Sequence, residues 1–184
     1  KSDRVPRNYS GNPRITERLM AHFGAVTHEE LLTALKTDIR GVSAPYRGPR
    51  LHAEIAERTV DPLWGIRRRW ISYGESGYDD FCDFPLSLGD TAKVRSWPMP
   101  SPDDFDHAAV RTQCERHAAF GVYTGGAGLG DIINSTGMLF GMEDTLVGLL
   151  TGDEAILTFI DRKLDITAEV LYRTIEASAG GIDF

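Results

Sequence analysis

The chain has 184 residues, of which 41% are hydrophobic and 26% are charged, and its formal net charge at pH 7 is −7. This is the composition of a globular protein with enough chain for one sizeable core. The acidic balance argues against nucleic acid or an anionic membrane as the main partner. No apolar run is nearly long enough to span a bilayer. The sequence also does not start with the basic region and apolar region of a secretory signal peptide, so we expect a cytoplasmic protein. Cys82 and Cys114 are expected to be buried thiols rather than a disulfide.

The N-terminal quarter of the chain predicts helices between two short strands. Asn12 is a suitable N-cap for a helix that Gly24 ends. Thr27 and Glu30, in the sequence T-H-E-E, form a capping box that starts a second helix. The expected elements are a strand over residues 4–10, a helix over 13–23, a helix from 27 and a strand over 38–45.

Residues 46–86 have a different sequence pattern from the flanking segments, and this pattern predicts a β-hairpin insert. Apolar and polar residues alternate, and turn signals occur at D-P (61–62) and Y-G-E-S-G (73–77). The basic run R-R-R-W (67–70) is typical of nucleic-acid binding when it stands alone. Here it is followed by Asp79, Asp80 and Asp83, and so we interpret it as a solvated hairpin face.

The rest of the chain alternates helices with short strands. A proline-rich connection leads to Ser101 and Pro102, which begin a helix that runs to about His117. Apolar residues at helical spacing predict a long helix after T-G-D-E-A (151–155), with Ile156, Ile160, Leu164, Ala168, Leu171 and Ile175 on one stripe. The expected elements are a helix over 102–117, a strand over 120–125, helices over 138–150 and from 151 to 178, and a strand beginning at 182.

Strands that alternate with helices indicate parallel βα units. Two architectures fit this order, the doubly wound sheet and the (β/α)₈ barrel. A complete barrel takes about 250 residues, so four βα units in this length correspond to half of one.

The glycine-rich stretch F-G-V-Y-T-G-G-A-G-L-G-D (120–131) is the most conspicuous motif. A dinucleotide-binding loop places a third glycine where this chain has Asp131, and a P-loop ends in Gly-Lys-Ser/Thr, which is absent here. Two interpretations stay open, a plain turn and a backbone that a ligand approaches closely. Asp131 and Asn134 are the polar side chains next to this stretch, and either could instead cap the following helix.

Two stretches carry a resemblance to a known family. Residues 3–11 read DRVPRNYSG, and residues 121–177 run from GVYTGGAGLGDIINSTG to LYRTIEA. The first is similar to the opening barrel strand of the uroporphyrinogen decarboxylase superfamily. The second is similar to that superfamily's central block, in which a strand ending in glycines precedes a helix, a short loop and a long helix. The resemblance implies an α/β fold: a TIM-type (β/α)₈ barrel, of which residues 1–184 form one partial domain with the first four βα units and the insert at about 46–86.

The resemblance also implies where a ligand binds. In such barrels, ligands lie at the C-terminal ends of the strands, so polar and aromatic residues there are the candidate site. Asp131 is the candidate catalytic residue. The candidate substrate-binding residues are Asn8, Tyr9, Ser10, Tyr46, Arg47, Arg50, Tyr123 and Asn134. Arginine suits carboxylates, although Arg47 and Arg50 could equally be loop charges.

The resemblance implies chemistry on tetrapyrroles or corrinoids. Members of the superfamily are cofactor-free tetrapyrrole decarboxylases and cobamide-dependent methyltransferases. The arginine-rich substrate loop of the decarboxylases is replaced here by Y-S-G-N-P-R-I-T-E-R (9–18), and the second strand ends in V-S-A-P-Y-R-G (42–48) without a carboxylate. We therefore expect a small-molecule or corrinoid-related substrate other than uroporphyrinogen. No H-x-C or C-x-x-C zinc motif occurs, so zinc or a corrinoid is expected only in a longer protein.

A second hypothesis is that the segment binds a tetrapyrrole, or assembles with another chain, without catalysis. No nucleophile–base pair is evident in the sequence, which favours this alternative. Four parallel strands cannot close a barrel, so their edges are expected to stay exposed. We therefore expect a segment of a longer protein, or association of two copies as a homodimer.

Overall fold

The computed structural model describes residues 4–74, 76–125 and 131–184, and it is a mixed α/β structure. Its small sheets are one parallel pair of strands and one antiparallel group of three. The elements in chain order are α1 (Pro13–Phe23), α2 (His28–Ala34), β1 (Ile39–Gly41), β2 (Thr59–Val60), β3 (Arg67–Tyr73), β4 (Ser76–Phe81), α3 (Thr91–Ser96), the 3₁₀ helix η1 (Pro102–Asp104), α4 (Ala108–Arg116), β5 (Gly121–Tyr123), α5 (Ile132–Phe140), α6 (Met142–Thr151) and α7 (Glu154–Ala177).

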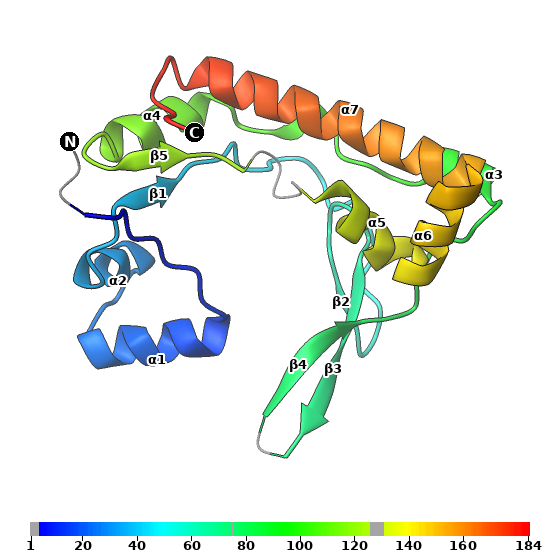
Figure 1. Ribbon diagram of the computed structural model, residues 1–184, viewed down its shortest axis with the longest axis horizontal. Coiled ribbons are helices and arrows are strands. Elements are labelled where there is room, and N and C mark those ends of the chain that lie inside the picture. The colour runs from blue at the N-terminus through cyan, green and yellow to red at the C-terminus, as the bar shows by residue number, and fades with distance from the viewer. Residues whose placement is uncertain (1–3, 75, 126–130) are drawn as a thin grey trace.

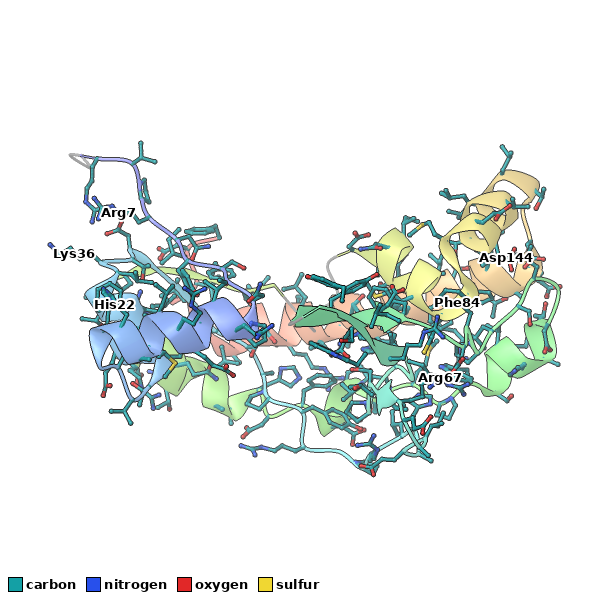
Figure 2. All side chains as sticks on the ribbon, turned by 90° about the horizontal axis from the view of Figure 1, so that it is seen from below. Arg7, His22, Lys36, Arg67, Phe84 and Asp144 are labelled. Carbon is teal, nitrogen blue, oxygen red and sulfur yellow. The ribbon has the colours of Figure 1, made fainter. Side chains whose placement is uncertain are left out.

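Helix α7 runs along the molecule and joins its two ends (Figure 1). At one end lie β1, β5, α4 and the pair α1–α2. At the other end lie the hairpin β3–β4 and helices α5 and α6, beyond the points at which β1 and β5 end. The same division is visible from below, where Arg7, His22 and Lys36 mark one end and Arg67, Phe84 and Asp144 mark the other (Figure 2).

The parallel strands form the first of two apolar cores. β1 pairs with β5 in the register Arg40 opposite Val122. Every second side chain points to the same face of a strand. Val42, just after β1, and Val122 on β5 pack in a cluster with Val110 of α4 and Val170 of α7. The second core lies around the other half of α7. It contains Trp64, Ile66, Leu86, Val94, Leu139, Phe140, Ala155, Ile156, Phe159 and Ile160.

The C-terminal residues extend the parallel pair, close to where a fourth strand was predicted. The N–H of Phe184 donates to the carbonyl of Val122 at 3.3 Å, and the N–H of Thr124 donates to the carbonyl of Phe184 at 3.2 Å. This alternation is the pattern of a parallel pair. Residues 182–184 therefore lie beside β5 as β1 does on its other side, although they do not form a regular strand.

Local capping signals fixed the ends of several helices as predicted. Asn12 accepts a hydrogen bond from the N–H of Ile15, and Gly24 adopts the left-handed conformation with φ of 65° at the end of α1. The insert is the expected hairpin, with β3 and β4 paired in antiparallel register. Helix α7 begins after Asp153, whose side chain accepts from two backbone N–H groups.

The strand expected over residues 4–10 is wrong, because this segment is extended without a regular ladder. Pro6 has no N–H to donate, and the N–H of Arg7 donates to the carboxylate of Asp38 at 2.7 Å instead of to a neighbouring strand. One backbone bond, from the N–H of Asp38 to the carbonyl of Arg7, holds the segment beside the start of β1.

Two predicted helices are each broken in two. The helix expected over 102–117 stops at η1 and resumes at α4, because Phe105 forms a bridge with Tyr46 between them. The helix expected over 138–150 is divided at Gly141, whose φ of 89° lies outside the helical region, and its first part begins earlier, at Ile132. Helix α3 was not predicted.

Only part of the predicted apolar stripe of α7 is buried. Ile156 and Ile160 lie in the core, whereas Leu164 and Ile175 are 44% and 50% exposed. The buried face instead includes Phe159, Lys163, Val170 and Thr174.

We expect the capping box of α2 to contribute measurably to stability. The Thr27 hydroxyl accepts from the N–H of Glu30, and the Glu30 carboxylate accepts from the N–H of Thr27, both at 3.2 Å. Thr27→Ala should lower the free energy of unfolding by about 1 kcal/mol. Urea denaturation measures the change, and Thr27→Ser, which keeps the hydroxyl, should restore most of it. Equal loss in both variants would contradict this assignment.

Candidate functional site

A pocket of about 400 Å³ lies between the N-terminal segment, α2 and the parallel strands. It brings together three of the predicted site residues, Asn8, Tyr9 and Tyr123. Asn8 and Tyr9 come from the extended segment before α1, whereas Tyr123 is the last residue of β5. The remaining lining residues are His28, Glu29, Leu32, Ile39, Arg40, Gly41 and His117.

Tyr123 and Phe184 form a flat aromatic surface next to this pocket. Their ring centroids are 6.2 Å apart and the rings are inclined by 13°. A Cβ atom added to Gly41 would lie 3.1 Å from the Tyr123 ring, so the absence of a side chain on β1 lets the ring lie flat against that strand. Gly121 similarly faces the ring of Phe184. Tyr123 is 36% exposed and Phe184 is 64% exposed, so both rings are partly open to solvent.

Arg40 forms the buried wall of the pocket. Its Nε donates to the Glu29 carboxylate at 2.9 Å, its Nη1 donates to the hydroxyl and the carbonyl of Thr37, and the guanidinium lies 3.9 Å from the centroid of the Phe120 ring. Nη2 also lies 2.9 Å from Glu29, but it makes no hydrogen bond of good geometry within the described residues. Glu29 neutralises the guanidinium, so this wall is polar and uncharged overall.

The sequence did not single out the two histidines of the pocket. His28 is the first residue of α2, and its ring centroid lies 6.3 Å from that of Tyr9. His117 is the C-cap of α4, just before β5. Both lie at helix ends far apart in the sequence, and only the packing of α2 and α4 around β1 brings them to one pocket.

Tyr46, Arg47 and Arg50 do not line this pocket and instead hold the insert in place. The Tyr46 hydroxyl donates to the carbonyl of Pro49 at 2.8 Å. Arg47 lies 3.7 Å from the carboxylate of Asp106, and Arg50 donates to the carbonyls of His52 and Val60. Their guanidinium groups thus have partners within the chain. Ser10 is exposed and also lies outside the residues that line the pocket.

Asp131 is the N-cap of α5, which is one of the two roles that the sequence left open. Its carboxylate accepts from the N–H of Asn134 at 2.9 Å. Both residues are exposed and lie at the helix start that follows β5. A capping role does not remove the carboxylate from solvent, so Asp131 remains available to a ligand. Residues 126–130 of the glycine-rich stretch lie outside the described residues.

We expect two substitutions of Asp131 to separate capping from chemistry. Asp131→Ala removes the cap and should lower the free energy of unfolding by about 1 kcal/mol. Asp131→Asn keeps an acceptor oxygen and should be within a few tenths of a kcal/mol of the wild type. Thermal unfolding of the two variants checks this difference. Asp131→Asn is then the variant in which loss of ligand binding or turnover reports on the carboxylate itself, and identical unfolding of all three proteins would refute the capping role.

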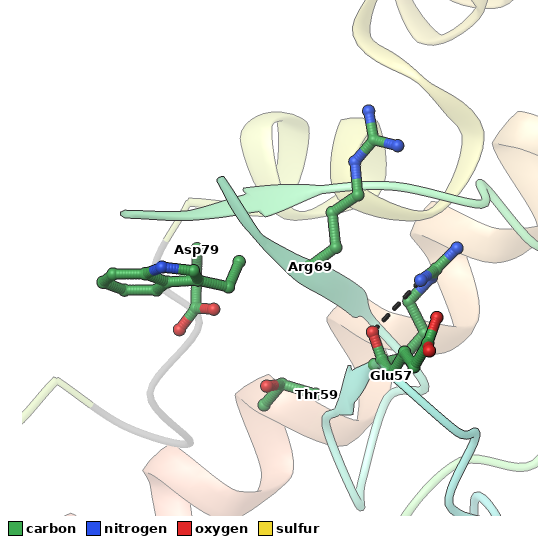
Figure 3. A pocket seen from close by; sticks show the side chains of 6 residues that line it. Glu57, Thr59, Arg69 and Asp79 are labelled. Atoms are coloured by element: carbon green, nitrogen blue, oxygen red, sulfur yellow. Dashed lines mark hydrogen bonds between the residues drawn. The ribbon is translucent and has the colours of Figure 1, made fainter. Parts of the chain in front are cut away.

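A second pocket, of about 580 Å³, lies on the hairpin (Figure 3). Glu57, Thr59, Arg69 and Asp79 line it with Arg58 and Trp70. Arg58 is held by the carboxylate of Asp83 and by the carbonyl of Glu57. Charges of both signs therefore line an open surface, and this mixture does not favour one class of ligand.

Lys163 is the most unusual ionisable group of the described structure. Its side chain on α7 is fully buried, and its Nζ lies 2.5 Å from the hydroxyl of Ser135 on α5. The rings of Trp64 and Phe159 lie 5.0 Å and 5.7 Å from the ammonium. Burial lowers the pKa of Lys163 to about 8, and the carboxylates of Asp61 and Asp131 act in the opposite direction.

The described residues contain no group of three or more His, Cys, Asp or Glu side chains that could hold a metal ion. Within the same ranges, no helix combines the length and the apolarity needed to cross a membrane. Cys82 and Cys114 are both buried free thiols, as predicted, and burial raises the pKa of each. Comparisons of the chain with protein-family models, with curated protein sequences and with solved structures find no match.

Proposed function

We propose that this chain forms the first half of a (β/α)₈ barrel of the uroporphyrinogen decarboxylase type. The enzyme would act by decarboxylation or methyl transfer on a tetrapyrrole- or corrinoid-related substrate other than uroporphyrinogen. The chemistry is taken from the sequence resemblance. The single structural observation that supports it is the flat, exposed Tyr123–Phe184 surface beside the pocket that contains Asn8 and Tyr9.

The order of the parallel segments is that of consecutive βα units, which a barrel repeats and which each half of a doubly wound sheet also contains. β1, β5 and residues 182–184 are consecutive parallel segments of the chain, and each lies beside the next. A doubly wound sheet reverses its strand order at a switch point, where its ligand binds. No reversal occurs among these segments, and the connections between them carry helices, as in consecutive barrel units.

The pocket's chemistry suits a planar ligand that carries few carboxylates. Aromatic rings that expose a face stack on other flat rings, in offset or tilted arrangements. Asn8, His28 and His117 offer hydrogen-bonding groups at the pocket wall. The one arginine of the pocket is already paired with Glu29, so it offers no clamp for substrate carboxylates. This supports a substrate other than uroporphyrinogen.

Zinc is a cofactor of the methyltransferase branch of the superfamily. The described residues do not include a ligand set that fits it, so no step of the proposed chemistry runs through a metal held by them. Zinc or a corrinoid would have to be bound with the help of residues beyond those described.

A binding or assembly module without catalysis is the second candidate. The observation that favours it is that several polar groups of the pocket are engaged within the chain. The Tyr9 hydroxyl bonds to that of Thr16 at 2.9 Å, and Arg40 and Glu29 bond to each other. A pocket whose polar groups are already satisfied holds a ligand by shape and stacking more readily than it activates one.

Turnover assays on the intact protein distinguish the candidates. Methyl transfer from a methylated corrinoid to a thiol, or decarboxylation of a tetrapyrrole carboxylate, supports the enzyme and eliminates the module. Saturable binding of a corrinoid or porphyrin without either reaction supports the module. Turnover of uroporphyrinogen at a rate typical of enzymes would overturn the substrate assignment.

A further inference from the structure

Lys163 connects α7 to the first turn of α5 through one side chain. Its amino group donates to the Ser135 hydroxyl, and that hydroxyl donates in turn to the carbonyl of Asp131, each at 2.5 Å. The N–H of Ser135 also donates to this carbonyl at 3.1 Å. Two hydrogen bonds thus link the lysine to the residue that caps α5, and the rings of Trp64 and Phe159 lie 5.0 Å and 5.7 Å from its buried amino group.

The contact of Lys163 on α7 with Ser135 and Asp131 on α5, here called the joint, buries a lysine without a close counter-ion. The charged groups that act on Lys163 are Asp61, in the loop between β2 and β3, and Asp131 at the start of α5. Neither carboxylate is within ion-pair distance of the ammonium among the described residues, and Ser135 is the hydrogen-bond partner that holds it. An ammonium that leaves water without a close counter-ion is strongly disfavoured.

We propose that Lys163 is a proton-operated latch, which holds the first turn of α5 and Asp131 against α7 when it is neutral and loosens them when it is protonated. A local opening of this joint would let water hydrate the amino group of Lys163 and so favour its charged form. Protonation and opening are therefore coupled, because each favours the other. The latch would make the position of the exposed start of α5 depend on pH.

This inference rests on the proposed function only in that Asp131 is the candidate catalytic residue that the sequence resemblance implies. The latch itself is a property of the protein without ligand, and its test needs neither substrate nor turnover. Failure to bind any tetrapyrrole would overturn the proposed function and leave the latch intact. A joint that does not respond to pH would overturn the latch alone.

Amide hydrogen exchange of α5 tests the latch. With a pKa near 8 in the closed joint and 10.5 when open, the population of the open joint should fall by about 30-fold between pH 6.5 and pH 9.5. Pulse-labelled exchange, corrected for the intrinsic pH dependence of exchange, measures this at the amides of residues 135–140. The amides of α4 on the other core are the internal reference and should lack this response.

Lys163→Met should abolish the pH dependence in α5 and leave protection at or above its level in the wild type at pH 9.5. Lys93→Met, which removes an exposed lysine from α3, should behave as the wild type. The same pH response in Lys163→Met, or equal responses of α5 and α4 in the wild type, would overturn the proposal. If Lys163→Met does not fold, comparing the pH response of amide exchange in α5 with that in α4 of the wild type still tests the proposal.

Discussion

Lys163→Met is expected to raise the free energy of unfolding by about 3 kcal/mol at pH 7. Lys163 is fully buried and its pKa is lowered from 10.5 to about 8, mainly by burial. The unfolded chain therefore binds this proton more tightly than the folded protein does. Methionine has a similar length, carries no charge and is well suited to contact Trp64 and Phe159. Ser135 keeps its bond to the carbonyl of Asp131 in the variant.

The gain should depend on pH in a defined window. Below pH 8 both states of the wild type are protonated, and the full penalty for burying the charge is present. As the pH rises from 8 to 10.5 the folded lysine is neutral, and the wild type regains stability relative to the variant. Urea denaturation at pH 7 and pH 10 measures both values, with Lys93→Met as the control that should change by less than about 0.5 kcal/mol. A destabilised Lys163→Met, or a gain that is equal at both pH values, would contradict the assignment.

Arg40→Ala is expected to lower the free energy of unfolding by about 3 kcal/mol. The side chain of Arg40 is 2% exposed and contacts Glu29, Thr37 and the ring of Phe120. The substitution removes a stacked guanidinium, leaves Glu29 without its partner and opens a cavity between α2 and β5. Glu29 is 46% exposed, so water can hydrate its carboxylate and limit the loss.

Two matched variants give this prediction its control. Arg69 is exposed on the hairpin and forms no ion pair within the described residues, so Arg69→Ala should change stability by less than about 0.5 kcal/mol. Glu29→Gln keeps the shape of the pair and should cost less than Arg40→Ala, because the guanidinium retains its bonds to Thr37 and Ile39. Denaturation midpoints compare the three proteins. An Arg40→Ala protein as stable as Arg69→Ala would show that the buried pair is dispensable.

Features that depend on a few neighbouring residues could be predicted from the sequence. The N-cap Asn12 and the capping box of Thr27 fix helix starts through bonds that span three residues. The hairpin follows from alternation and from its turn signals. The capping role of Asp131 is also local, and the sequence identified it as one of two alternatives.

Features that depend on tertiary contacts could not be predicted from the sequence. Residues 4–10 read as a strand, but the side chain of Asp38 takes the backbone N–H that a neighbouring strand would use. The break before α4 arises because Phe105 pairs with Tyr46, some sixty residues earlier. Helix α3 is short and begins at Thr91, directly after the N-cap Asp90, a capping residue that the sequence could have revealed.

The candidate site was predicted in part for the same reason. Asn8, Tyr9 and Tyr123 were predicted as ligand-facing positions, and they do line one pocket. Tyr46, Arg47 and Arg50 were selected by their place after β1, but intramolecular partners hold them elsewhere. His28, His117 and Arg40 join the pocket only because α2 and α4 pack around β1. The burial of Lys163 could not be predicted for another reason: a single lysine within an amphipathic helix gives no sequence signal that it is buried.

Absorbance titration with hydroxocobalamin and with a carboxylated porphyrin tests directly whether the Tyr123–Phe184 surface binds a flat macrocycle, as proposed. We predict saturable binding of one of these to the intact protein and about fivefold weaker binding to Tyr123→Ala, because a stacked ring contributes about 1 kcal/mol. Tyr73→Ala is the matched control, since Tyr73 is 59% exposed on the hairpin and contacts Tyr78 rather than the pocket. It should bind as the wild type does. Absence of binding to the wild type, or equal loss in both variants, would contradict macrocycle binding at the Tyr123–Phe184 surface.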